Sequence, residues 1–164
     1  MSDITIREVT PDDIPAIKII TQKSWEGYFQ MCRQRLGEKI FDVTKRGWES
    51  WKPDQVAMQC EPETKDYVLV AEVDGQIAGF ATYFLNAGKP GIGEISNNAV
   101  SPEFQGRGIA TKLYAEVLDR MRKADMKVAK VYTGLDDSHI PARRAYEKLG
   151  FSRNLQSIEY YQTL

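Results

Sequence analysis

The sequence predicts a mixed α/β fold, and three features of the second half of the chain carry that prediction. Two β-rich runs flank Asp74-Gly75, a dipeptide that strongly indicates a hairpin of antiparallel strands. Two further β-like runs flank a long amphipathic helix pattern. A strand–helix–strand unit of this length requires a right-handed crossover and a parallel pair. The expected strands of this half span residues 67–73, 76–85, 94–100 and 128–133.

The first half of the chain is expected to hold one strand and then helices. Residues 4–9 alternate apolar and polar side chains, as a half-buried strand does. Thr10 and Pro11 suit the start of a helix, because a threonine can cap it and a proline fits its first turn. A second helical region is expected over about residues 30–60. Its expected breaks are near Gly37 or Gly47 and again at Pro53.

The remaining elements follow from periodicity and end signals. Residues 108–124 repeat apolar side chains every three to four positions, which predicts a helix. A short helix is expected from Ser138 to Gly150, where the glycine ends it. Residues 152–164 alternate in polarity and predict a closing pair of short strands. The length and the lack of linkers or repeats predict a single domain over residues 1–164.

Composition excludes several classes of function. The 22 basic and 23 acidic residues give a net charge of −1, without the basic excess of a nucleic-acid-binding protein. Cys32 and Cys60 form no Cys-x-x-Cys pair, and with a single histidine they argue against a metal site. No apolar run has the length of a signal peptide or a membrane span. We therefore expect a cytoplasmic protein with reduced thiols and no membrane partner.

The stretch Gln105-Gly106-Arg107-Gly108-Ile109-Ala110 lies between an expected strand and an expected helix. Glycines there let the backbone approach a ligand, and the free N–H groups of a helix start suit a phosphate or pyrophosphate. The run is no P-loop, because it lacks Gly-Lys-Ser/Thr. It is no dinucleotide fingerprint either, because Thr111 stands where a third glycine or alanine is needed.

This loop resembles the pyrophosphate-binding motif Gln/Arg-x-x-Gly-x-Gly/Ala of the GNAT superfamily, the acetyl-CoA-dependent N-acetyltransferases. The run of residues 142–151 is similar to the later motif of that family, which contains Tyr-Glu-Lys and ends in Gly-Phe. The resemblance covers residues 67–151 and the first strand. One position departs from it, because His139 stands where the family usually has an asparagine.

The resemblance implies a mixed, mainly antiparallel sheet of six to seven strands flanked by helices. Its two parallel central strands would splay apart, with acetyl-CoA in the gap between them. Backbone amides of the glycine loop would hold the pyrophosphate, and a β-strand edge would align the pantetheine arm and polarise the thioester carbonyl. Arg107 either adds charge or is simply solvated. The implied cofactor residues are Asn98, Ala99, Val100, Gln105, Gly106, Arg107, Gly108, Ile109, Ala110, Thr111 and His139.

Two residues are candidates for proton transfer. Glu94 lies eleven positions before Gln105, where some protein-acetylating members carry a glutamate, and could act as general base directly or through a water. It could equally be an ordinary charge at a strand start. Tyr146 matches the tyrosine that many members use as general acid toward the departing thiolate, although it could pack in the core. His139 is a further acid or base by its chemistry, or a solvated residue of a first helical turn.

Residues 24–51 contain all three tryptophans of the chain. The simpler interpretation is that these aromatic side chains form the inward stripe of amphipathic helices. The functional hypothesis is that Trp25 and Tyr28 line a pocket for the acceptor. A covalent mechanism would need a base beside Cys32 or Cys60, and the single histidine lies far away in sequence. We therefore expect direct transfer in a ternary complex.

The leading hypothesis is an N-acetyltransferase that moves acetyl from acetyl-CoA to a primary amine, carried by a small molecule or a peptide. The alternatives are an acyl-CoA-binding sensor or regulatory module without turnover, and a partner-binding module that does not need the glycine loop. Dimers are common in the resembled family, so a homodimer is compatible with the sequence. The acceptor and the acyl-chain preference remain open at this stage.

Overall fold

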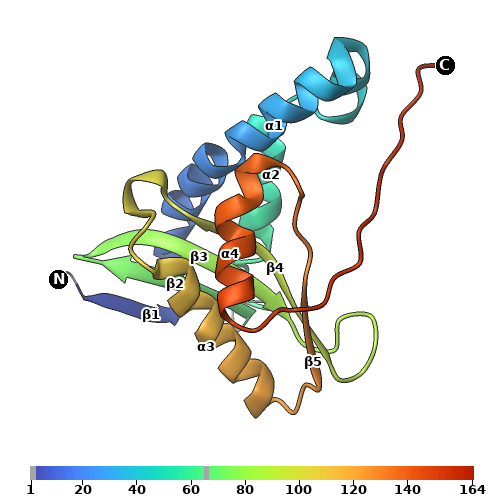
Figure 1. Ribbon diagram of the computed structural model, residues 1–164. Coiled ribbons are helices and arrows are strands. Elements are labelled where there is room, and N and C mark those ends of the chain that lie inside the picture. Colours follow the sequence, from blue (N-terminus) through green and yellow to red (C-terminus); the bar gives the residue numbers. More distant parts are fainter. Residues whose placement is uncertain (1–2, 65–66) are drawn as a thin grey trace.

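The structure is a computed structural model that describes residues 3–64 and 67–164. One sheet lies between two layers of helices (Figure 1). Its strands are β1 (Ile4–Glu8), β2 (Val68–Val73), β3 (Gln76–Phe84), β4 (Ile92–Val100) and β5 (Val128–Val131). The helices are α1 (Ile14–Thr44), α2 (Trp48–Met58), α3 (Ile109–Lys123) and α4 (Ile140–Lys148). Short 3-10 turns precede three of them: η1 (Pro11–Asp13), η3 (Pro102–Phe104) and η4 (Asp137–His139).

The strand order is β1-β2-β3-β4-β5, with antiparallel pairing up to β4 and a parallel pair between β4 and β5. The hairpin predicted at Asp74-Gly75 is confirmed, and both residues have positive φ, 51° and 77°, as a tight hairpin turn requires. The parallel pair predicted from the strand–helix–strand unit is confirmed as well. It ends at Ile95 paired with Val131, whereas β4 continues to Val100. Beyond Ile95 the two strands separate.

The expected count of six to seven strands is wrong for the described part of the chain, where five strands form. The expected closing strands in residues 152–164 are absent, because this segment runs extended beside the body without pairing to the sheet (Figure 1). Its Leu155 is 100% exposed. As a result β5 is an edge strand, and the splayed parallel pair lies at the edge of the sheet rather than at its centre.

The helical first half forms, with different boundaries. The two helices expected over residues 11–60 divide at Gly47, and α1 is interrupted at Gly37, whose φ of 73° is non-helical. The break expected at Pro53 is wrong, because this proline is buried inside α2. Pro53 is the sixth residue of α2, so its missing N–H leaves the Glu49 carbonyl without the usual i→i+4 hydrogen bond, while the helix continues to Met58.

Each face of the sheet has its own core. The α3/α4 face packs residues such as Ala81, Tyr83 and Ile95 against buried side chains of α3. The α1/α2 face packs Phe80 and Ala99 against α1 and α2. A Cβ on Gly93 would lie 2.6 Å from the sulfur of Met121, so the glycine allows α3 to approach β4 closely. This contact places the end of α3 beside the start of β4.

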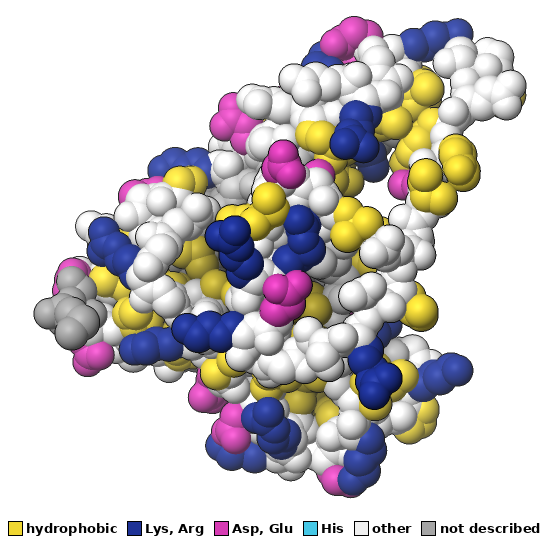
Figure 2. All heavy atoms as spheres, in the orientation of Figure 1, with side chains coloured by type: hydrophobic (Ala, Val, Ile, Leu, Met, Phe, Trp, Pro, Cys, Tyr) yellow, Lys and Arg dark blue, Asp and Glu magenta, His cyan; other side chains and the backbone are white. Residues whose placement is uncertain are grey.

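Basic and acidic side chains are interspersed over the face shown in Figure 2, and exposed apolar side chains lie along the C-terminal segment. None of the helices in residues 3–64 and 67–164 is both long and apolar enough to cross a bilayer.

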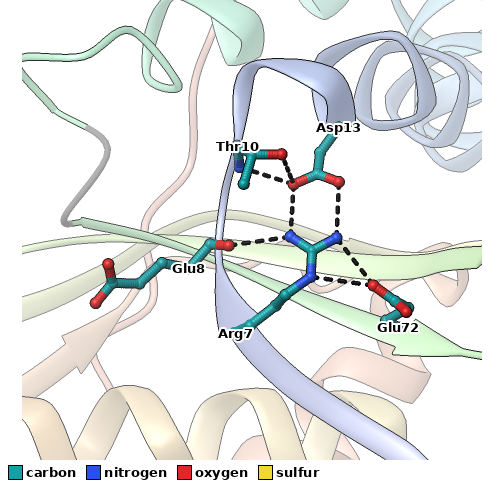
Figure 3. Close-up of polar contacts among 5 residues, drawn as sticks. All are labelled: Arg7, Glu8, Thr10, Asp13 and Glu72. Carbon is teal, nitrogen blue, oxygen red and sulfur yellow. Dashed lines mark hydrogen bonds and ion pairs between the residues drawn. The ribbon is translucent and has the colours of Figure 1, made fainter. Parts of the chain in front are cut away.

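A charged cluster joins the N-terminal strand to the rest of the sheet (Figure 3). Arg7 on β1 donates to both carboxylate oxygens of Asp13 at 2.7 and 2.9 Å and to Glu72 on β2 at 2.9 Å. The Thr10 N–H also donates to Asp13 at 2.7 Å. Asp13 is only 5% exposed. Burial alone would raise the pKa of the Asp13 carboxyl, but the hydrogen bonds from Arg7 and Thr10 outweigh it and hold the pKa below the ordinary 3.8.

The substitution Arg7→Met is expected to lower the free energy of unfolding by about 2 kcal/mol at pH 7, because it leaves the buried Asp13 carboxylate without its counter-charge. The double variant Arg7→Met/Asp13→Asn should recover part of that loss, since no unpaired charge remains. Urea unfolding followed by circular dichroism measures both changes. Equal stability of the wild type and Arg7→Met would contradict this role of the cluster.

The same cluster predicts an acid-sensitive contribution to stability. Because the pKa of Asp13 is lower in the folded protein than in the unfolded chain, its stabilisation is present at neutral pH and is lost as the pH falls below 3.8. The stability difference between the wild type and Asp13→Asn should therefore shrink through that range. A difference that stays constant from pH 7 to pH 3 would show that the carboxylate charge contributes nothing.

Candidate functional site

The glycine loop lies between η3 and α3 at the end of β4. Gly106 and Gly108 have φ of 77° and 79°, a region that other residues enter only with strain. Gly108 is the N-cap of α3. A Cβ placed on either glycine would meet no atom within 4 Å, so the outer side of the loop is open.

The first turn of α3 offers free backbone donors to this open side. Lys112 donates its N–H to the Gly108 carbonyl at 3.1 Å, and the N–H groups of Ile109, Ala110 and Thr111 precede that bond. Together with the positive end of the helix they can bind an anion. Arg107 is exposed beside them, with its guanidinium 5.1 Å from the centre of the Phe104 ring. Its charge lies at the loop and carries no ion pair among the described residues.

The end of β4 provides a second set of free backbone groups. The Ser101 N–H donates to Ala78 on the β3 side at 2.8 Å. Because successive N–H groups of a strand point to opposite edges, those of Asn98 and Val100 face the side where β5 has ended. The Gln105 side chain donates to the Val100 carbonyl on that same side at 3.2 Å. Ala99 instead packs its side chain into the core under α1 and α2.

A β-bulge in β4 decides which side chains share a face. Ala81 pairs with Asn98 and Tyr83 with Ile95, so two residues of β4 lie opposite one residue of β3. The extra residue reverses the alternation beyond Ile95. Asn98 therefore lies on the α3/α4 face, while Glu94 lies on the α1/α2 face, although the two are four positions apart.

On the α3/α4 face, Asn98 joins two buried tyrosines. Its Oδ1 accepts from the Tyr114 hydroxyl at 2.6 Å and from the Tyr146 hydroxyl at 3.1 Å. The two rings lie 5.0 Å apart, and Tyr146 is 4% exposed. Burial raises the pKa of Tyr146 above the ordinary 10, although its bond to Asn98 partly offsets this. The hydroxyl therefore keeps its proton at neutral pH and can act as a donor.

Tyr114 of α3 belongs to this group as well, although no motif marks it and it lies within the apolar repeat of residues 108–124. It is 3% exposed, and burial raises its pKa well above 10. Its position four residues after Ala110 of the glycine loop is the signal that could have indicated it. Tyr114 and Tyr146 thus share one acceptor, the Asn98 Oδ1.

The structure does not bring Glu94 and Tyr146 onto the same face of the sheet. Glu94 forms an ion pair of 2.8 Å with Lys130, its neighbour on β5, and its side chain is partly exposed. Glu94 lies on the α1/α2 face of the sheet together with Asn97. An acceptor that contacts Glu94 would therefore approach β4 from the face opposite to the two tyrosines.

His139 caps α4 and is fixed by its neighbours. Its Nδ1 lies 2.8 Å from Asp136, and its ring meets the edge of Tyr28 on α1 at 5.6 Å. Arg143 donates to the carbonyls of Gly134 and Asp136 at 2.6 and 2.9 Å, which secures the loop after β5. His139 of the segment after β5 and Tyr28 of α1 are thus in contact.

Trp25 lies beside a lysine that the sequence did not indicate. The Nζ of Lys52 on α2 lies 5.0 Å from the centre of the Trp25 ring, and it donates to Asn97 of β4 at 2.7 Å. Burial lowers the pKa of Lys52 to about 8. No sequence motif marks this position.

Three aromatic residues of the helical half are buried, while Trp51 is 39% exposed. Phe29, Phe41 and Trp48 form a buried cluster with Cys32. Both cysteines are buried and unbridged, and burial raises the pKa of Cys60 to about 11, which keeps it a thiol.

These features define a class of protein. An anion-binding helix start, an unpaired strand edge running toward it and a buried hydroxyl at that edge suit an extended, phosphate-bearing cofactor and a proton transfer at its far end.

Comparison with known proteins agrees with this class. The family model described as acetyltransferase (GNAT) family matches residues 28–151, and the chain belongs to that family. It is 27% identical over 151 residues to an uncharacterized N-acetyltransferase of Methanocaldococcus jannaschii, a match that covers 90% of this chain and 60% of that protein. The chain thus spans less than two thirds of that relative.

Two solved structures share the fold. An N-acetyltransferase from Thermoplasma acidophilum in complex with coenzyme A has a TM-score of 0.70 at 18% identity, covering 94% of this chain and 93% of its own. A GNAT family acetyltransferase from Brucella melitensis in complex with acetyl-CoA has a TM-score of 0.62 at 23% identity, covering 92% and 84%. Acetyl-CoA as the expected cofactor is thereby confirmed for the family of this chain.

The residues present fit this cofactor. The open side of the glycine loop and the free N–H groups of residues 109–111 suit a pyrophosphate. The free N–H groups of Asn98 and Val100 suit the amides of an extended chain, which can add to a strand edge as another strand would.

The substitution Tyr146→Phe is expected to lower kcat about 100-fold with little change in KM for acetyl-CoA, because it removes a proton donor and leaves the ring in place. Tyr114→Phe is the matched control. It removes the other hydroxyl on Asn98 and should cost about 1 kcal/mol of stability while most of kcat remains. Steady-state assays of thiol release measure both, and equal loss of kcat in the two variants would assign Tyr146 a packing role only.

Proposed function

We propose that the protein transfers an acetyl group from acetyl-CoA to a primary amine by direct attack within a ternary complex. The observation that carries the proposal is the continuity of the glycine loop, the free edge of β4 and the Asn98–Tyr146 hydrogen bond. The glycine loop suits the phosphate-bearing end of an extended acyl carrier, and the free edge of β4 suits the arm that leads to its reactive end. The Asn98–Tyr146 pair provides a proton donor at that reactive end.

In this proposal, backbone N–H groups of two segments hold the cofactor. The N–H groups at the start of α3 hold the pyrophosphate, with Arg107 adding charge beside them. The N–H groups of Asn98 and Val100 hold the extended arm and the acyl carbonyl oxygen. Acetyl-CoA, when bound, supplies the activated thioester. Holding both reactants in one cleft accounts for much of the rate, because effective molarities in such complexes are large.

Two residues handle protons. Tyr146 donates a proton to the departing thiolate, which its raised pKa permits at neutral pH. Glu94 receives a proton from the acceptor amine, either directly or through a water, since an ammonium has no lone pair with which to attack. Tyr146 of α4 bonds to Asn98 on the α3/α4 face of the sheet, whereas Glu94 lies on the α1/α2 face. Glu94 would then accept the proton of the amine on one side of β4, and Tyr146 would protonate the thiolate on the other side.

The cofactor site is tested by acetyl-CoA binding to wild type and Gly108→Glu in a calorimeter. A carboxylate at the start of α3 repels a pyrophosphate, so binding should weaken by about 100-fold or more. Gly88→Glu is the matched control, because Gly88 also has positive φ and open space around its Cβ but lies in the loop before β4. Equal binding by all three proteins would overturn the proposed cofactor site.

Turnover is tested separately with a panel of amines and an assay of thiol release. Glu94→Gln should lower kcat by about 100-fold and leave acetyl-CoA binding unchanged, because the residue acts on the acceptor. Normal acetyl-CoA binding without transfer to any amine would favour the non-catalytic acyl-CoA sensor instead.

A further inference from the structure

Lys52 presents its ammonium group to β4 from the side opposite to the tyrosines. Its Nζ donates to Asn97 Oδ1 at 2.7 Å and to Gln55 Oε1 at 2.7 Å, and the Trp25 ring covers it at 5.0 Å. The Asn97 amide in turn donates to Gln59 at 2.7 Å, which turns its oxygen toward Lys52. Four side chains from three elements therefore fix the position of one cation.

Within residues 3–64 and 67–164, no carboxylate forms an ion pair with Lys52. The contacts of its ammonium group there are with two amide oxygens and an indole ring. Burial is the one cause that lowers its pKa to about 8, so at pH 7 it remains charged in a partly desolvated position. Several other lysines have acidic partners: Lys18 with Asp54, Lys23 with Glu103, Lys123 with Asp119 and Lys130 with Glu94.

Thr82 on β3 has a buried hydroxyl without a hydrogen-bond partner in the described protein. It lies opposite the bulge of β4 that contains Asn97, and its register partner Val68 belongs to the α1/α2 core. A buried hydroxyl without a partner is costly, and this one lies on the face of the sheet where Asn97 accepts from Lys52.

We propose that Lys52, positioned by Asn97 and Gln55, binds a carboxylate of the acceptor, so that the acceptor is an amine that also carries a carboxylate, such as an amino acid. This inference rests on the proposed transfer to an amine. An ammonium has three donors, and two of them are used by amide oxygens, which leaves the third for a carboxylate oxygen. A single cation held by two amides suits one carboxylate better than a phosphate, which usually recruits several cations.

The placement also explains how an amine would reach its base. Asn97 is next to Asn98, whose backbone N–H faces the free edge of β4, and Glu94 lies on the same face as Asn97. A short acceptor bound by its carboxylate at Lys52 would extend its amine along β4. Lys52 is thus a specificity-determining residue, and the proton transfers remain with Glu94 and Tyr146.

The test compares acceptors that differ only in the carboxylate: alanine, methionine and phenylalanine against their carboxamides. Wild type should prefer the acids in kcat/KM by about 10-fold or more, since the amides lack the charge. Lys52→Met should lose this preference and keep its rate on the amides. Lys52→Arg should keep part of it, because the charge remains. Lys18→Met, which removes an exposed lysine of α1, is the control and should leave the preference unchanged.

A binding measurement gives a readout without turnover. N-acetylmethionine should bind wild type more tightly than N-acetylmethioninamide in calorimetry, and Lys52→Met should bind both equally. Transfer to other amines without any acid preference, or no acid preference in binding, would overturn this inference and leave the acetyltransferase proposal intact. If Lys52→Met lowered kcat/KM equally on the acids and the amides, this inference would also be overturned, because that result would indicate that Lys52 acts as a base. Absence of acetyl-CoA binding to the wild type would instead overturn the proposed function itself.

Discussion

The arrangement of the site depends on β4 extending beyond the last residue with which β5 pairs. Pairing with β5 stops at Ile95, and β4 continues to Val100 beside a strand that has already left the sheet. Two consequences follow from that mismatch in length. Backbone donors of Asn98 and Val100 remain free at an edge of the sheet, where a ligand can take the place of a neighbouring strand. The chain then turns through η3 into the glycine loop, so the free edge and the start of α3 form one continuous surface of N–H groups.

The bulge in the same strand divides the chemistry between two faces. Tyr114, Tyr146 and Asn98 form a hydrogen-bonded group under α3 and α4, whereas Asn97, Lys52 and Gln59 form another against α2. The two asparagines are adjacent in sequence, so the groups are separated by little more than the thickness of one strand. A transfer reaction uses such a division well, because the donor and the acceptor each need their own polar surroundings and must still meet at one atom.

The features that sequence predicted are those with local causes. The hairpin at Asp74-Gly75, the helix after Gly108 and the glycine loop follow from turn chemistry, from periodicity and from backbone requirements within a few residues. The contacts of Asn98 with Tyr146 and of Asn97 with Lys52 join residues 48 and 45 positions apart, and no periodicity encodes them. The bulge was also invisible, since Glu94 and Asn98 seem from spacing alone to share a face. The prediction of closing strands was wrong for a related reason. The alternation around Ile158 and Tyr160 indicates a strand, but a strand forms only when another strand pairs with it, and this segment has no pairing partner in the described chain.

The bulge also limits how this protein can change over evolution. A shift of β4 by one residue relative to β3 beyond Ile95 would turn every following side chain of β4 to the other face. Asn98 would then lose both tyrosines. Loss of one residue of the bulge has a different result, because Asn98 would still lie opposite Ala81 and only the α1/α2 face would lose a side chain such as Asn97. Insertions in the loop before β4 carry no such penalty, because they leave the register intact. The length of this one strand is therefore a heritable constraint, set by geometry rather than by the identity of any single side chain.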